Sequence, residues 1–294
     1  MPFSRQIAAP GFGNPVRRRR RFRLPRAAGF ALAPALAVFC AFWLIPFAYL
    51  VALGTTLDNS SRQNAYWIVL THPRYLQSLV ATLLLSIAVA LATVAIATIV
   101  AFFLARRRFP GKGLLLALLT FPLALPGVVV GFLIIMLGGR QGLFAHLGMA
   151  LTNERWTFAY SMTGLFLGYL YFSLPRVIMT LTAACGKLDR NLEEAARSLG
   201  AGSWRIAADV ILPGLAPALF SSAALCFATC MGAFGTAFTL GTDLNVLPLT
   251  IYGEFTNYAN FATSAALSVL LGLVTWAALL LARRFTTVTA EAAL

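Results

Sequence analysis

A short polar segment, residues 187–213, stands between long apolar runs and carries the side chains best able to make specific ionic contacts. Within it, apolar residues recur at the spacing that places them on one face of a helix: Leu192, Ala195, Ala196 and Leu199. Charged residues fall on the opposite face: Arg190, Glu193, Glu194 and Arg197. Small alanines let another surface approach closely, and a carboxylate supplies a directional ionic contact. The pattern therefore predicts either a helix that docks against a partner protein or an amphipathic helix on a membrane surface.

Residues that satisfy free backbone groups mark both ends of this helix. Asp189 or Asn191 can cap its start by accepting a hydrogen bond from a backbone N–H, and Gly200 can adopt the positive φ that ends a helix. Gly202 is then predicted to interrupt the helical structure a second time, and Pro213 suits the first turn of a following helix. The segment is predicted to form a helix–turn–helix elbow.

The composition of the chain is that of an integral membrane protein. Of its 294 residues, 60% are hydrophobic and only 11% are charged, and the mean hydropathy is +0.81. Six stretches contain no Asp, Glu, Lys or Arg: Ala27–Leu57, Tyr75–Ala105, Gly113–Gly139, Trp156–Pro175, Val210–Thr242 and Phe255–Ala282. Each can supply the roughly 20 apolar residues that a membrane-crossing helix needs, and their apolar runs do not alternate as barrel strands would. The predicted class is an all-α integral membrane protein with six transmembrane helices.

The distribution of basic residues predicts the orientation, because Lys and Arg accumulate on the cytoplasmic side of spans. With the N-terminus inside, 19 of the 23 basic residues fall on the cytoplasmic side, and Arg176 is one of these 19. The four that fall outside are Arg62, Arg74, Arg140 and Arg155. Both termini and the 187–213 segment are then cytoplasmic. The expected organisation is a basic cytoplasmic tail over 1–26, a membrane domain over 27–284 and a second cytoplasmic tail over 285–294.

The basic run at residues 17–23 is expected to contact anionic membrane lipid and to set the insertion orientation. A nucleic-acid partner is not expected, although basic runs do bind phosphates. The apolar stretch after Arg26 is longer than the core of a cleaved signal peptide, so it is predicted to remain as the first span.

The polar segment also resembles a known motif. Glu194-Ala195-Ala196 is followed by three residues, a glycine, nine residues and Val210-Ile211-Leu212-Pro213. This spacing is similar to the Glu-Ala-Ala loop of type I ABC importer permeases, in which Ile usually stands at the position of Val210. The resemblance, together with the helical pattern, identifies the expected ATPase-coupling residues: Glu193, Glu194, Ala195, Ala196, Arg197, Gly200, Leu212 and Pro213.

The resemblance covers about Tyr75 to Arg284 and implies a set of partners in a bacterial inner membrane. These are a cytoplasmic ABC ATPase dimer, a second permease subunit that is expected to be a different chain, and an extracytoplasmic solute-binding protein. The chain has no G-x-x-x-x-G-K-[ST] loop, so ATP and Mg are expected in the partner ATPase. No cofactor is expected on this chain, and it is not expected to be an enzyme.

Two prolines predict an irregular third span. Pro122 and Pro126 lie too close together for both to sit in an unbroken hydrogen-bond ladder, so a kink or an interruption is expected. Such breaks are tolerated in membranes where the backbone faces protein or a water-filled cavity. A bend needed only for packing is the alternative.

The segments around the fifth and sixth spans resemble those of spermidine/putrescine-type permeases: residues 232–238, 245–249 and 251–255. A polyamine is therefore the expected solute, and the alternatives are a phosphonate, sulfate, iron or thiamine type. Acidic and aromatic groups would favour a cation, which makes Glu254, Tyr252 and Asp243 the candidate pathway residues. Solvated loop charges, or contacts to the binding protein, would explain the same carboxylates. A secondary transporter or channel is disfavoured, because the six stretches lack ionisable residues.

No metal site or catalytic constellation is expected. Cys226 and Cys230 lie one helical turn apart, but small packing residues explain them better than a ligand pair. The two histidines, His72 and His146, have no partners at catalytic or ligand spacing.

Overall fold

The computed structural model describes residues 26–57, 63–107, 109–241 and 244–292, with side chains described for residues 33–284 of these ranges. Within them the chain is helical, without a named strand. It divides into two compact units, residues 1–48 and 49–294. The first unit contains α1 (Arg26–Phe39) and a π-helical turn (Cys40–Leu44), and α2 (Ile45–Gly54) begins in it. Three rings stack along these consecutive helical segments: the ring centroids of Phe39 and Trp43 are 5.1 Å apart, and those of Trp43 and Phe47 are 5.6 Å apart.

The second unit holds the remaining helices. In chain order they are α3 (Ala65–Thr71), α4 (Pro73–Arg106), α5 (Lys112–Thr120), a 3₁₀ turn (Phe121–Ala124), α6 (Gly127–Gly138), α7 (Leu143–Thr152), α8 (Met162–Lys187), α9 (Arg190–Ser198), α10 (Ser203–Ile206), a π turn (Ala207–Ile211), α11 (Leu212–Met231), α12 (Gly235–Leu240), α13 (Leu247–Thr256) and α14 (Phe261–Ala292).

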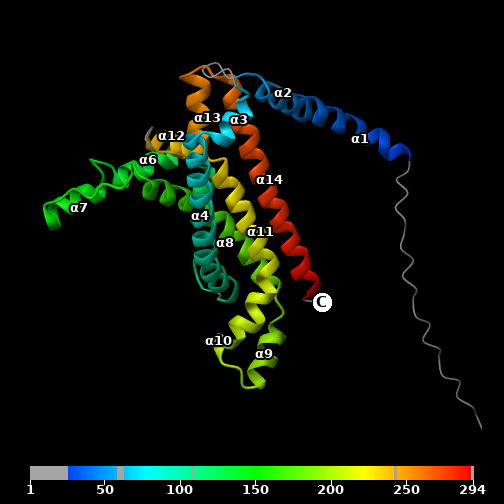
Figure 1. Ribbon diagram of the computed structural model, residues 1–294. Helices are drawn as coiled ribbons and strands as arrows, with labels where there is room; N and C mark the ends of the chain where they lie inside the picture. The colour runs from blue at the N-terminus through cyan, green and yellow to red at the C-terminus, as the bar shows by residue number, and fades with distance from the viewer. Residues whose placement is uncertain (1–25, 58–62, 108, 242–243, 293–294) are drawn as a thin grey trace, which may run out of the picture. The chain divides into compact units, whose positions relative to one another are not determined.

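A bundle of long helices forms the centre of this unit. α4 packs along α8 and α11, and α14 packs along α11 (Figure 1). α9 and α10 lie beyond one end of the bundle, and α3 and α13 lie at the other end (Figure 1). The buried core between the helices includes Leu104, Leu165, Tyr169, Leu181 and Leu215.

Six helical segments of the described residues are long and apolar enough to cross a membrane, which agrees with the predicted number. They are Ala33–Gly54, Pro73–Arg106, Gly127–Thr152, Met162–Lys187, Ser203–Met231 and Phe261–Arg284. The prediction for 1–26 falls almost entirely outside the described residues. At the other end, α14 continues as a helix to Ala292, so the described part of the expected tail over 285–294 is helical.

The third predicted span is interrupted, as the two prolines indicated. α5 ends at Thr120, a 3₁₀ turn follows, and Leu125 and Pro126 are extended before α6 begins at Gly127. Leu125 is extended because the ring of the following proline disfavours the helical conformation for it. The long apolar segment here is consequently Gly127–Thr152, made of α6 and α7, instead of Gly113–Gly139.

The fourth and fifth predicted spans also needed correction. The fourth was expected to end at Pro175, but α8 runs without interruption to Lys187 and places Arg176 in its interior. The fifth was expected to continue to Thr242, but α11 ends at Met231 and the short α12 begins at Gly235. Both errors arose because the length of an uncharged run does not show where the backbone hydrogen bonds of a helix begin and end.

Buried hydroxyls fasten α13 to α4 where α13 begins. The Thr82 hydroxyl oxygen accepts a hydrogen bond from the backbone N–H of Leu247 at 2.8 Å, and the Ser78 and Thr250 hydroxyls are 3.0 Å apart. All four residues are buried, so these bonds satisfy groups that would otherwise lose water without replacement.

Candidate functional site

The predicted coupling segment forms a helical elbow at the end of the bundle. The Asp189 carboxylate accepts a hydrogen bond from the backbone N–H of Asn191 at 3.0 Å, so Asp189 is the cap of α9. Gly200 has a φ of +81°, the left-handed conformation expected for it at the end of the helix. Gly202 caps α10, which continues through the π turn into α11. Pro213 lies in the first turn of α11, as predicted.

The apolar face of α9 is open to solvent in this chain. Leu192 is 57% exposed and Leu199 is 88% exposed, and Trp204 of α10 is 86% exposed. An open hollow of about 260 Å³ lies between α9 and the following turn, and Ala196, Leu199 and Gly200 help to line it. Large apolar side chains exposed in a row, next to a hollow, are typical of a surface that another protein covers.

The two adjacent carboxylates of α9 have different surroundings. Glu193 accepts a hydrogen bond from the Arg106 guanidinium at the end of α4, and the two side chains are only 13% and 16% exposed. Arg106 also lies over the ring of Phe102, 5.7 Å from its centroid. Glu194 is exposed. Glu193 therefore ties α9 to the bundle, and Glu194 is free to face outward.

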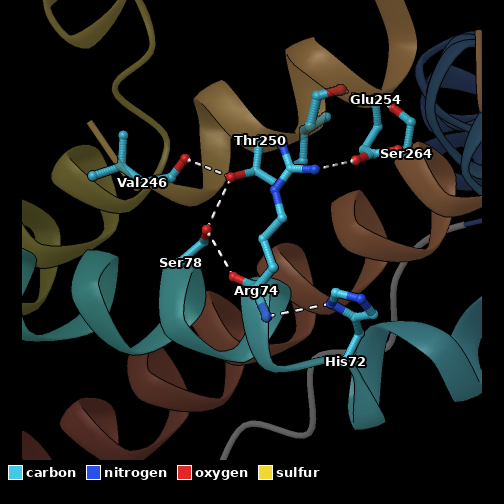
Figure 2. Close-up of polar contacts among 8 residues, drawn as sticks. His72, Arg74, Ser78, Val246, Thr250, Glu254 and Ser264 are labelled. Carbon is cyan, nitrogen blue, oxygen red and sulfur yellow. Dashed lines mark hydrogen bonds and ion pairs between the residues drawn. The ribbon is translucent and has the colours of Figure 1, made fainter. Parts of the chain in front are cut away.

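Of the candidate pathway residues, Glu254 and Tyr252 have different surroundings in the described structure. Glu254 is buried in α13, with its carboxylate 3.5 Å from the Arg74 guanidinium at the start of α4 (Figure 2). Arg74 itself lies over the ring of Tyr258. A carboxylate that is 4% exposed and paired with arginine joins two helices and is poorly placed to attract a cation from solution. Asp243 lies outside the described residues.

Tyr252 belongs to an aromatic cluster with Phe234 and Phe238. Its ring centroid lies 5.2 and 5.3 Å from theirs. Phe234 stands in the gap between α11 and α12, where the carbonyl of Ala233 accepts a hydrogen bond from the buried Tyr169 hydroxyl. The α11–α12 break is thus held by α8 on one side and by aromatic packing on the other.

The two helix breaks lie at one open hollow of about 370 Å³. Pro122, Leu125 and Gly127 line it from the α5–α6 break, and Gly232 and Gly235 from the α11–α12 break. α6 and α12 contact closely here: the Thr236 hydroxyl donates to the carbonyl of Gly127 at 2.9 Å. A Cβ on Gly131 would lie 2.6 Å from the Cβ of Thr239, so this contact requires glycine.

Arg176 lies at the same hollow, and the sequence interpretation missed it. Its Nη1 donates to the Thr229 hydroxyl of α11 at 3.3 Å. The residue was assigned to the cytoplasm because the apolar stretch was ended at the first charged residue. The apolar run that resumes at Val177 and continues towards Cys185 was the signal that the span continues.

Six candidate membrane helices, two interrupted helices and an exposed elbow at the end of a bundle define a multi-pass helical membrane protein of the transport class. Residues 94–289, more than half of the chain, match the family of binding-protein-dependent transport system inner membrane components. The chain belongs to this family, the permease subunits of type I ABC importers. It is a multi-pass inner-membrane transport subunit and not an enzyme, since ATP hydrolysis resides in a separate subunit of these importers.

Several characterised relatives are similar in sequence. The sulfate transport system permease CysT of Escherichia coli K12 is 30% identical over 245 residues, which cover 82% of this chain and 86% of that protein. The molybdenum transport system permease ModB of the same strain is 35% identical over 180 residues, which cover 60% and 76%. The chain spans only 55% of a chloroplast sulfate permease of Chlamydomonas reinhardtii, at 32% identity.

The fold is similar to that of a chain in a bacterial alginate ABC transporter, crystallised with a periplasmic protein that carries an alginate pentasaccharide. The TM-score is 0.72 at 16% identity, and the match covers 89% of this chain and 95% of that chain. At this identity the likeness concerns the fold alone.

Proposed function

We propose that this chain is the permease subunit of an importer for a small tetrahedral oxyanion of the sulfate or molybdate kind. The observation that carries the proposal is the similarity, at 30% to 35% identity, to permeases named for sulfate and for molybdenum. Molybdenum in neutral aerobic water is the molybdate dianion, which shares the shape and charge of sulfate. The two relatives thus represent one class of solute.

The polyamine expectation is supported less well than this alternative. The segments at residues 232–238, 245–249 and 251–255 resemble polyamine permeases only weakly, and the two Escherichia coli relatives are named for sulfate and molybdenum. Glu254 is buried against Arg74, so it offers little attraction for a polycation. The hollow at the two helix breaks contains an arginine, and no carboxylate is found among its described lining residues.

We further propose that α9 is the docking helix for the ATPase. A rigid, capped helix transmits force better than a flexible loop, and α9 has a capped start, a glycine end and an exposed apolar face. Glu194 would supply the directional ionic contact to the ATPase, and Leu212 and Pro213 would join the elbow to α11. ATP and Mg would be held by that partner, and this chain would bind no cofactor.

The proposed mechanism is alternating access. Closure of the ATPase dimer on ATP draws the elbows of two permease subunits together and opens the pathway outward to receive solute from its binding protein. Hydrolysis then returns the pathway to the inward-facing state. The second permease is proposed to be a different chain.

The solute is tested by uptake into proteoliposomes that contain the complete transporter and its binding protein. ATP-dependent accumulation of radioactive sulfate or molybdate is expected, with no accumulation of putrescine. Accumulation of putrescine alone would reject the oxyanion and restore the polyamine interpretation.

The docking helix is tested by purification in mild detergent. The wild-type chain is expected to carry an ATPase, and Glu194→Ala is expected to lose most of it. Ser198→Ala is the matched control, because its hydroxyl bonds only within α9, to the carbonyl of Glu194 at 3.0 Å. Full retention of the ATPase by Glu194→Ala would count against docking through this carboxylate.

A further inference from the structure

One charged residue lies deep within a membrane-crossing helix. Arg176 is the fifteenth residue of the 26-residue helix α8, which contains no other charged residue except Lys187 at its end. At 1.5 Å per residue, Arg176 stands about 21 Å from the start of α8 and about 17 Å from its end. That depth is near the middle of a bilayer, where an arginine side chain is strongly disfavoured against lipid.

No described carboxylate lies within ion-pair distance of this side chain. Its guanidinium donates to the Thr229 hydroxyl, and the residue is otherwise exposed. Arginine stays charged at any ordinary pH, so its charge must be balanced by water, a partner subunit or a solute.

Arg176 lines two hollows of the described structure. The first, of about 370 Å³, is the one at the helix breaks, and α6 begins there at Gly127 without a side-chain cap. The second, of about 120 Å³, is lined by Thr180, Ser221 and Ser222, among others. The lining residues of both hollows include hydroxyls and backbone but no carboxylate.

One further feature favours an anion over a cation here. The start of a twelve-residue helix such as α6 carries a partial positive charge, which adds to that of the guanidinium. The Ser222 hydroxyl, which lines the second hollow, is buried and has no hydrogen-bond partner in the described structure, so it can bond a group of either charge that enters there. The first hollow exceeds the roughly 30 Å³ share of one water in the liquid by about tenfold, so it admits a small hydrated anion.

We propose that Arg176 is the solute-contact residue of the translocation pathway and binds a tetrahedral oxyanion at the level of the two helix breaks, beside the Thr229 hydroxyl. The planar guanidinium matches two oxygens of such an anion at once. This inference rests on the proposed function, since it assigns the oxyanion to a place in the pathway.

The first test measures uptake in proteoliposomes that contain both permeases, the ATPases and the binding protein. Arg176→Gln is expected to lower sulfate or molybdate uptake about tenfold or more, and Arg176→Lys is expected to fall between it and the wild type. Binding-protein-stimulated ATP hydrolysis should stay within about twofold, because the elbow is untouched. Arg140→Gln, a change in the turn between α6 and α7, is the matched control and should transport normally.

The outcomes separate this inference from the proposed function. If the wild type transports oxyanions and Arg176→Gln does so equally well, the solute-contact role falls and the proposed function stands. If the wild type transports another solute and no oxyanion, the proposed function falls and the inference falls with it.

A second test avoids variants that fail to assemble. Val128→Cys, at an exposed position that lines the first hollow, is introduced with Arg176 intact and with Cys40→Ala, since the other three native cysteines are buried. A water-soluble thiol reagent should label Cys at this position in the complete transporter, and sulfate or molybdate should slow the labelling about threefold or more. That protection should vanish when Arg176→Gln is added. Labelling that oxyanions do not slow, or a position that no reagent reaches, would overturn the inference.

Discussion

The ion pair between Arg106 and Glu193 is predicted to hold α9 rigidly against the bundle, so that a movement of α9 also moves α4. It joins the end of α4 to the first turn of α9, the proposed docking helix, and it is the one ion pair between α9 and the bundle in the described part of the chain. Replacing Glu193 by Gln keeps the shape of the side chain but removes its charge. Arg106 would then remain largely buried with only an amide beside it.

The magnitude follows from the burial of the pair. Fully exposed ion pairs contribute about 0.2–1 kcal/mol, and breaking a fully buried pair costs about 3–5 kcal/mol. Both side chains are less than one fifth exposed, but Arg106 is the last residue of α4, so the pair lies at the end of that helix and not in its middle. We therefore expect Glu193→Gln to cost about 2 kcal/mol, which converts to about thirtyfold if all of it opposes the docked position of α9.

Two measurements on the assembled transporter test this prediction. The dissociation constant of the ATPase from the permease should rise by up to about thirtyfold, and the number of solutes moved per ATP should fall. A double-mutant cycle with Arg106→Gln isolates the pair from other effects of each change. Glu194→Gln, one residue further along α9, separates loss of the rigid attachment from loss of the docking charge, because Glu194→Gln should not couple to Arg106→Gln.

A coupling energy between Glu193→Gln and Arg106→Gln below about 0.5 kcal/mol, the range found for independent sites, would refute the rigid attachment of α9 through this ion pair. Unchanged stoichiometry of transport in Glu193→Gln would refute it equally, because a loosened docking helix cannot move the bundle by the same amount.

Three further predictions concern the elbow and the outer attachment of α13. Gly200→Ala should cost about 1–2 kcal/mol from backbone strain at positive φ and should lower uptake per ATP. Gly202→Ala, at a φ of −69°, should cost only about 0.5 kcal/mol, from the weaker cap of α10, and should leave uptake per ATP unchanged. Glu254→Gln should lower the free energy of unfolding by about 1–2 kcal/mol, measured by thermal denaturation in detergent, without changing the solute concentration for half-maximal uptake. Thr82→Val should cost about 1–3 kcal/mol, because the buried N–H of Leu247 would lose its acceptor.

Each of these has an outcome that contradicts it. Equal effects at the two glycines would show that bulk, and not the positive φ, matters at the elbow. A shift in half-maximal uptake with Glu254→Gln would return that carboxylate to the pathway. Unfolding at the wild-type temperature for Thr82→Val would mean that water reaches the start of α13.

The elbow could be predicted in detail because its signals are local. Caps, the glycine at the helix end and the helical spacing of the apolar residues depend on neighbours within a turn or two, and the structure places Asp189, Gly200 and Pro213 as expected. The interruption before α6 was predictable for the same reason, since a proline restricts its own backbone and that of the residue before it. The number of spans followed from apolar length.

The pairing of side chains across helices could not be read from the order of residues. Glu193 and Glu194 are equivalent by type, and only the approach of α4 makes one a buried partner of Arg106 and leaves the other free. Glu254 likewise has an arginine partner only because the start of α4 brings Arg74 to it.

The sequence by itself determined the membrane class, the number of membrane-crossing helices and the helical elbow at residues 187–213, because hydrophobicity, turn chemistry and caps act over short distances along the chain. The apolar run after Arg176 could have placed this residue inside a span, but tertiary structure alone decided that it lines two hollows, because α11 packs beside α8 and the α11–α12 break lies at the first of them. The partner that stabilises the Arg176 side chain inside its span is the Thr229 hydroxyl, which is close in space but 53 residues away along the chain.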